Sequence, residues 1–96
     1  MIGEKHDAGK SRPGLVPGAV LLEIGRVLEY GARKYEPDGW KHVPGARGRY
    51  ADALMRHFAA WLDGEHADAE SALPHLAHVA TNAVFLLWFE VTGKWP

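Results

Sequence analysis

The stretch LPHLAHVATNAVFLLWF, residues 73–89, decides the fold of this chain. Residues 83–89 are all apolar, so a helix formed here is hydrophobic on every side. A helix of that kind has to be buried all round. Pro74 is suited to open this helix, with Ser71 or a neighbour as its N-cap, and the helix is expected to run to about Val91.

Apolar residues at helical spacing predict two more helices upstream. The first spans residues 17–34, with Pro17 at its start. The second is indicated by an apolar stripe that ends before Gly64 and consists of Ala51, Leu54, Met55, Phe58, Trp61 and Leu62. Residues 35–48 form a connection with two prolines and three glycines, and a connection this long is typical of a functional or mobile segment.

These patterns predict an all-α fold, because the sequence shows neither strand-like alternation nor an internal repeat. A length of 96 residues predicts one domain, residues 1–96, in which residues 1–16 form a basic N-terminal arm. Three helices cannot enclose one that is apolar on all sides. We therefore expect a small helical bundle that is completed by oligomerisation, as a dimer or a tetramer.

The composition excludes several classes of protein. The chain has no cysteine, which excludes disulfides and thiolate metal ligands. Its N-terminus lacks the apolar core of a secretion signal and no apolar run approaches the roughly 20 residues of a membrane span, so a cytoplasmic location is expected. Residues 1–49 hold nine Lys and Arg against six Asp and Glu (+3), and residues 50–96 hold two against six (−4). This split disfavours a nucleic-acid polymer as partner and suits an anion that arrives with a divalent cation.

Three polar residues interrupt the third predicted helix on one side. At about 100° per residue, His75, His78 and Asn82 fall within a sector of roughly 60°. Histidines three residues apart are neighbours on a helix surface and can share a metal ion or a phosphate. The alternative is that both are interior histidines whose hydrogen bonds are satisfied, and the spacing alone leaves the two interpretations balanced.

Further candidate metal ligands precede this helix. His57 follows Leu54 by one turn and can point inward, while the connection after the second helix supplies Glu65, Asp68 and Glu70. Oxygen and imidazole donors together suit Mg²⁺, Mn²⁺ or Co²⁺, and Zn²⁺ is less expected without cysteine or an H-x-x-x-H pattern. For the last two carboxylates, capping of the helix and stabilisation of its dipole are a strong alternative.

The first half of the chain offers contacts for an anion and a planar ring. Phosphates can be bound by Lys5, Lys10 and Arg12 of the arm and by Arg33 and Lys34 of the first predicted helix, although "DAGKS" lacks the spacing of a P-loop and the arm can equally be a solvated tail. Tyr35 and Trp40 flank the turn "EPDG" and can sandwich a planar ring, or else serve as packing anchors of the loop.

Three segments, taken in order, resemble a known family. HDAGKSRPGLVP (residues 6–17), LEYGARKYEPDGW (28–40) and ALMRHFAAWLDGEHADAESALPHLAHVATNAVFL (53–86) cover nearly the whole chain. They resemble the small phage nucleotide diphosphohydrolases of the MazZ type, which belong to the all-α, MazG-like nucleoside-triphosphate pyrophosphohydrolase superfamily.

The resemblance implies an enzyme that depends on a divalent metal and cleaves purine deoxynucleoside triphosphates between the α and β phosphates. Its products would be the monophosphate and pyrophosphate. The main expected substrate is dGTP, with GTP or dATP also accepted. In phages that replace adenine by 2-aminoadenine, such an enzyme supplies dGMP to a PurZ-type synthetase, in the cytoplasm of the infected bacterial host.

The sequence departs from the superfamily pattern at one point. That pattern is an E-x-x-E helix followed by an E-x-x-D helix, whereas here Glu65-x-x-Asp68 lies in a connection and the second acidic pair falls on His75 and His78. With this departure, the resemblance implies Glu65, Asp68 and His78 as catalytic residues. The implied metal ligands are His57, Glu65, Asp68, His75 and His78. The implied substrate contacts are Lys5, Lys10, Arg12, Lys34, Tyr35, Trp40, Arg56 and Asn82.

Two other functions fit parts of the sequence. A non-enzymatic helical oligomerisation or regulatory module would explain the apolar third helix, but it leaves the cluster of histidines and acids without a role. A metal phosphohydrolase that releases triphosphate, as HD-type enzymes do, needs an adjacent His-Asp pair. Here His57 is followed by Phe58, which disfavours that reaction.

Overall fold

The computed structural model describes residues 8–96 and contains three α-helices. They are α1 (Gly18–Lys34), α2 (Ala46–Leu62) and α3 (His75–Thr92). Two short 3-10 helices, η1 (Pro13–Leu15) and η2 (Gly39–His42), lie before α1 and between α1 and α2. Within residues 8–96 the β structure is limited to a single bridge between Ala67 and Pro74. The predicted all-α fold is confirmed.

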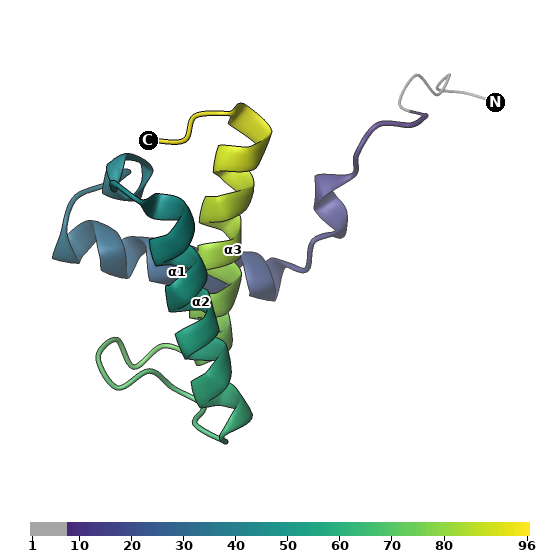
Figure 1. The fold of residues 1–96 in the computed structure, drawn as a ribbon. Helices are drawn as coiled ribbons and strands as arrows, with labels where there is room; N and C mark the ends of the chain where they lie inside the picture. The colour runs from purple at the N-terminus through teal and green to yellow at the C-terminus, as the bar shows by residue number, and fades with distance from the viewer. Residues whose placement is uncertain (1–7) are drawn as a thin grey trace.

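The helices form a pair with a third helix laid across it. α2 and α3 run side by side in opposite directions, and α1 crosses this pair and packs on α3 (Figure 1). Residues 8–17 lead away from the three helices as a separate arm (Figure 1). The connection between α2 and α3 returns along the lower end of the pair, and its bridge between Ala67 and Pro74 brings it back to the start of α3.

The helix boundaries follow local chemistry, with two differences from expectation. α2 begins at Ala46, five residues before the apolar stripe, because Gly45 adopts a left-handed φ of 69° and turns the chain into the helix. The N-cap position of α3 is occupied by Pro74, which makes no side-chain cap, so Ser71 does not cap this helix. Gly93, also left-handed at φ 69°, ends α3.

The core is centred on α3 and includes polar groups. Phe89 and Thr81 are fully buried, and Asn82 is nearly so. Thr81 Oγ1 donates to the carbonyl of Ala77 at 2.8 Å, and Asn82 Nδ2 donates to the carbonyl of His78 at 2.8 Å. Because both polar side chains bond to the preceding turn of their own helix, they can be buried without an unpaired donor.

An aromatic cluster attaches the connection after α1 to α3. The ring of Trp40 stacks on Phe85 with centroids 4.4 Å apart and meets Trp88 edge-on at 5.2 Å. The hydroxyl of Tyr50 donates to the carbonyl of Trp40 at 2.8 Å, which secures η2 from the α2 side. The geometry of Trp40 therefore favours the packing anchor over the ring sandwich, since its faces are used within the chain.

α3 is not buried on every side within a single chain. Phe89 is fully buried, but Leu87 is 61 % exposed and Val91 76 % exposed. Further large apolar side chains are exposed on α1 and α2, namely Val20, Leu21, Leu22, Met55, Phe58, Trp61 and Leu62. One chain thus leaves apolar faces on all three helices uncovered. Among the helices of residues 8–96, none combines the length and apolarity that crossing a bilayer requires.

Replacing Trp40 with alanine is expected to lower the free energy of unfolding by about 3 kcal/mol, the lower end of the range for Trp→Ala, because the ring is half-buried. Urea unfolding followed by far-ultraviolet circular dichroism measures this loss. Tyr35→Ala is the matched control, since that side chain is 75 % exposed and should change stability by no more than about 0.5 kcal/mol. Equal stability of the two variants would contradict the anchoring role.

Candidate functional site

Three histidines from two helices meet beside the lower turns of the α2–α3 pair. His57 comes from α2, and His75 and His78 come from the first turn of α3. The Nδ1 atoms of His57 and His75 lie 2.9 Å apart, and the rings of His57 and His78 stack with centroids 4.3 Å apart. His75 is 5 % exposed and His78 8 % exposed, so this is an interior arrangement open mainly on the His57 side.

Asp68 enters the cluster from the connection between α2 and α3. Its Oδ2 accepts hydrogen bonds from the backbone N–H and the hydroxyl of Ser71, both at 2.8 Å. The backbone N–H of Ala72 also donates to the carbonyl of Asp68 at 2.8 Å, which closes a tight turn. The side chain of Asp68 is therefore held in one orientation by the turn that follows it.

Ser71 links this carboxylate to His78. The Ser71 hydroxyl can donate only once, and Asp68 accepts that bond because a carboxylate has no proton to give. Ser71 Oγ lies 2.7 Å from His78 Nε2, so this nitrogen carries a proton and donates to the hydroxyl. Nε2 of His78 is thereby occupied by Ser71. Sequence reasoning considered Ser71 only as a cap, although the spacing D-x-x-S is a turn signal that could have revealed it.

Three side chains are placed to share a cation. His57, Asp68 and His75 each offer one ligand atom, and these atoms all lie within 4.8 Å of one another. Imidazole nitrogen and carboxylate oxygen are common ligands of divalent transition metals. Of the five predicted metal ligands, the structure groups these three, with Glu65 and His78 beside them.

One atom of the cluster has no hydrogen-bond partner in the structure. Nε2 of His75 is buried and makes no hydrogen bond. Oε2 of Glu65 is 3.2 Å away, within ion-pair reach but outside hydrogen-bond geometry, and the Glu65 side chain is 54 % exposed. A buried polar atom left unpaired is unfavourable. The donor chemistry at this point fits a cation held between the imidazole and the carboxylate.

The electrostatics of the cluster favour neutral side chains of His57 and His78 and an ionised Asp68. Burial lowers the pKa of His57, as does the neighbouring His78. Burial also lowers the pKa of His78, although the charge of Asp68 opposes this shift. For Asp68, burial alone would raise the pKa, but the two hydrogen bonds from Ser71 lower it below its ordinary value. Near pH 7 both imidazoles are neutral and the carboxylate is ionised, as metal binding requires.

A surface ion pair attaches the connection to α1. Nζ of Lys34, in the last turn of α1, lies 2.6 Å from Oε1 of Glu70. The hydrogen bond from Lys34 lowers the pKa of Glu70, and the same bond raises the pKa of Lys34. This pair holds the segment that carries Asp68 and Ser71 against the end of α1. It also means that the ammonium of Lys34 is engaged by a carboxylate.

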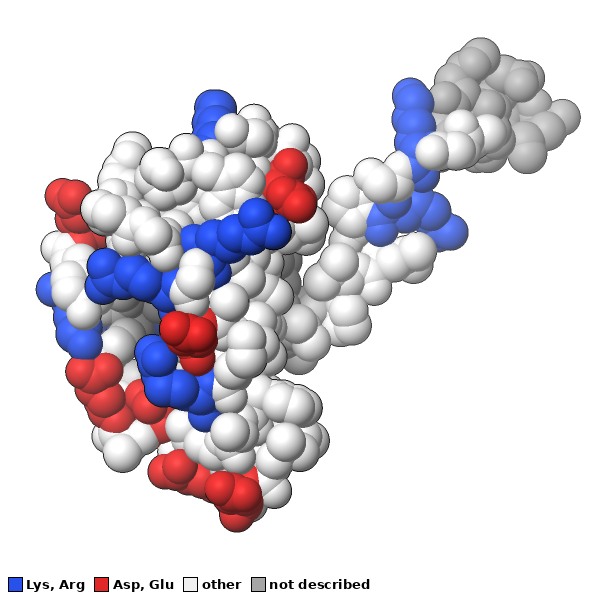
Figure 2. Space-filling model, in the orientation of Figure 1, with Lys and Arg blue, Asp and Glu red and all other residues white. Residues whose placement is uncertain are grey.

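The other predicted substrate contacts are scattered over the molecule. Lys5 lies outside the described residues, while Lys10 and Arg12 are exposed and belong to the arm, which leads away from the three helices (Figure 1) and carries basic side chains (Figure 2). Arg56 is exposed on α2, beside His57 in sequence, and the Asn82 amide is bonded within α3. The structure thus brings the predicted ligands together but does not bring the basic arm to them.

Comparison with known proteins shows which family the chain belongs to. The model of the family "dATP/dGTP diphosphohydrolase, N-terminal" matches residues 2–96. Over 88 residues the chain is 33 % identical to a dATP/dGTP diphosphohydrolase of Salmonella phage PMBT28, an alignment that covers 92 % of this chain and 30 % of that protein. No solved structure matches the chain. The predicted resemblance to phage diphosphohydrolases is confirmed, and the chain belongs to the dATP/dGTP diphosphohydrolase family, whose N-terminal region it matches.

Proposed function

We propose that this chain takes part in the metal-dependent hydrolysis of purine (deoxy)nucleoside triphosphates between the α and β phosphates. The substrate is chiefly dGTP, with GTP or dATP also accepted, and the products are the monophosphate and pyrophosphate. The observation that carries the proposal is that one ligand atom each of His57, Asp68 and His75 lie within 4.8 Å of one another. The family to which the chain belongs supports a nucleotide as the substrate.

His57, Asp68 and His75 would hold the cation, with Glu65 at its exposed side. This mixture of nitrogen and oxygen donors favours Mn²⁺ or Co²⁺, whereas Mg²⁺ would depend more on the two carboxylates and on the phosphates of the substrate. A bound divalent cation neutralises charge on phosphoryl oxygens and makes water a better nucleophile at neutral pH.

The side chains of the cluster have separate roles in the proposed reaction. The water oxygen forms a bond to one of the two phosphorus atoms, α or β, of the scissile linkage. The bond between that phosphorus and the bridging oxygen breaks, and its electron pair leaves on the bridging oxygen with the other product. Glu65 takes the proton of the attacking water. Its carboxylate lies at the edge of the cluster, 3.2 Å from His75 Nε2, and is half-exposed, so that water can reach it. Asp68 remains an ionised ligand, and Ser71 orients it. We assign His78 a positioning role through Ser71, in place of the direct ligation that the sequence suggested.

The product dGMP connects the reaction to 2-aminoadenine synthesis. In a phage that replaces adenine by 2-aminoadenine, dGMP is the purine that a PurZ-type synthetase would consume. Hydrolysis of dGTP or dATP would at the same time shape the deoxynucleotide pool of the infected cell. The phage origin of the relative supports this setting.

We also propose that a second copy of the chain covers the apolar faces of the helices. Leu62 at the end of α2 and Leu87 and Val91 on α3 are each more than 60 % exposed. Such a density of uncovered large apolar side chains is unusual for a monomer and typical of an interface. A homodimer or a homotetramer would bury these residues and enlarge a core that one chain of this length leaves small.

Incubation of the protein with dGTP and Mn²⁺ is expected to release pyrophosphate and dGMP. Phosphorus nuclear magnetic resonance distinguishes pyrophosphate from orthophosphate and triphosphate in the same sample. A matched reaction with EDTA should show no turnover. Release of triphosphate would favour the HD-type reaction, and the absence of turnover with every purine nucleotide and metal would favour the oligomerisation module.

His75→Ala and Asp68→Asn are expected to lower Mn²⁺ affinity by at least about tenfold, because the first removes a ligand atom and the second removes the negative charge of a ligand. Isothermal titration with Mn²⁺ measures the affinity, and circular dichroism verifies that the variants remain helical. Bound Mn²⁺ should also raise the melting temperature of the unaltered protein, and EDTA should abolish that rise. His42→Ala is the control, since this histidine is exposed on η2, outside the cluster. Unaltered affinity in His75→Ala would remove this residue from the metal site.

Light scattering at micromolar concentration is expected to give a mass at least twice that of one chain. Leu87→Arg should shift the mass toward one chain, because a buried, unpaired guanidinium is strongly unfavourable at an apolar interface. A stable, helical species of 10.6 kDa for the unaltered protein would contradict the proposed homo-oligomer.

A further inference from the structure

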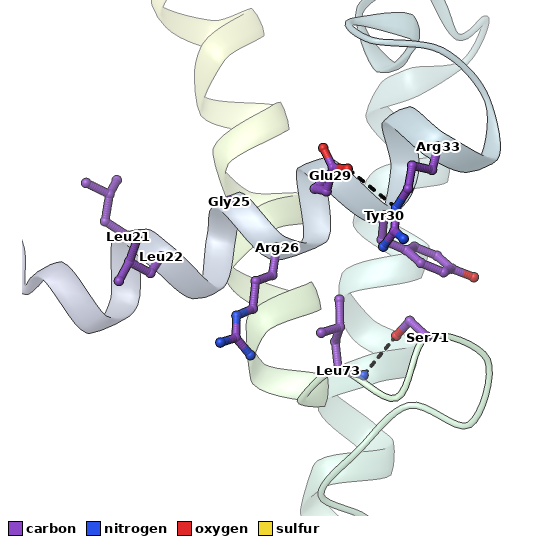
Figure 3. Close-up of a pocket in the computed structure, with 9 residues that line it drawn as sticks. All are labelled: Leu21, Leu22, Gly25, Arg26, Glu29, Tyr30, Arg33, Ser71 and Leu73. Carbon is purple, nitrogen blue, oxygen red and sulfur yellow. Dashed lines mark hydrogen bonds and ion pairs between the residues drawn. The ribbon is translucent and has the colours of Figure 1, made fainter.

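One face of α1 carries cationic and aromatic side chains that the proposed reaction does not yet use. Arg26, Tyr30 and Arg33 are spaced four and three residues apart, so they lie on the same side of the helix. Opposite them, Ser71 and Leu73 belong to the connection that carries Asp68. Between the two lies a hollow of about 500 Å³ (Figure 3).

The hollow leads to the metal-ligand cluster through Ser71. A second hollow adjoins the first, because Tyr30, Arg33 and Ser71 line both. Lys34 lines the second hollow as well. Ser71 Oγ is in turn 2.8 Å from Asp68 Oδ2 and 2.7 Å from His78 Nε2. A molecule in the hollow would therefore be separated from the proposed metal site by one small side chain.

Two arginines and one glutamate line the hollow, which gives its lining one net positive charge. The guanidinium of Arg26 is 3.8 Å from Glu23, and that of Arg33 is 3.5 Å from Glu29, which also lines the hollow. Arg26, Arg33 and Glu29 are exposed to solvent and Glu23 is half-buried, and at these separations the ion pairs are weak and screened by salt. Guanidinium groups bind phosphate oxygens through two parallel hydrogen bonds, which makes a phosphate a stronger partner than a distant carboxylate.

We infer that this hollow binds the phosphate chain of the nucleotide and that Arg26 and Arg33 contact its phosphates. The inference rests on the proposed function and specifies where the substrate lies. It assigns the phosphate contacts to α1 instead of Lys10 and Arg12 of the arm, a segment that leads away from the helices in Figure 1. The phosphate chain would reach the cluster past Ser71, which brings the scissile bond toward Asp68 and His57.

The test compares a ligand that has a base with one that has only phosphates. The two probes are the non-hydrolysable α,β-methylene analogue of dGTP and inorganic pyrophosphate, each titrated in the presence of Mn²⁺. Arg26→Ala and Arg33→Ala are expected to weaken both probes by about tenfold each, the usual effect of losing a charge-assisted hydrogen bond. The KM for dGTP should rise in parallel. Arg49→Ala is the control, since Arg49 is an exposed arginine of α2 that does not line the hollow. This variant should bind both probes as tightly as the unaltered protein does.

Each other outcome overturns the inference. Weaker binding of the analogue with unaltered binding of pyrophosphate would place the base or the sugar, not the phosphates, against the arginines. Unaltered binding of both probes would remove the hollow from the substrate site. Turnover of dGTP by the unaltered protein decides the proposed function separately, so normal turnover with unaffected arginine variants would overturn this inference alone.

Discussion

The antiparallel contact between α2 and α3 is the constraint on which the candidate site depends. It brings the Nδ1 atoms of His57 and His75 to 2.9 Å, although the two residues are 18 positions apart. It also stacks His57 on His78, so that three imidazoles share one interior volume. Burial and the neighbouring imidazoles both disfavour the charged forms of His57 and His78, so the pKa of each is lowered.

The short connection between these helices adds the negative charge that the histidines need. The backbone N–H and the hydroxyl of Ser71 both donate hydrogen bonds to Asp68, and the hydroxyl accepts one from Nε2 of His78. One residue therefore sets the orientation of the carboxylate and the tautomer of the imidazole. The ion pair of Lys34 with Glu70 then joins this connection to the end of α1 at the surface. The ligand atoms of the cluster thus come from α2, from α3 and from the connection between them. α1 supplies no ligand and is joined to the cluster through this connection.

The two halves of the chain, one basic and one acidic, contribute different charged residues to the proposed site. The basic first half places Arg26 and Arg33 on α1, and the acidic second half supplies Asp68 and Glu65. The hollow between α1 and the connection lies where these two halves meet. When an anion arrives with a divalent cation, the arginines of the first half would bind the anion and the carboxylates of the second half would bind the cation.

The sequence by itself determined the three helices and the residue types of the cluster, because apolar spacing and helix-ending residues such as Gly93 act over a few positions. It also indicated His57, Asp68 and His75 as candidates through their chemistry. Only the tertiary structure decided that these three meet, that His78 is bonded to Ser71, and that Trp40 packs on Phe85. The same holds for the arm, which the sequence predicts to contact phosphates but which leads away from the three helices in Figure 1. These outcomes depend on how helices pack and where connections turn, and such long-range contacts leave no periodic trace in the sequence.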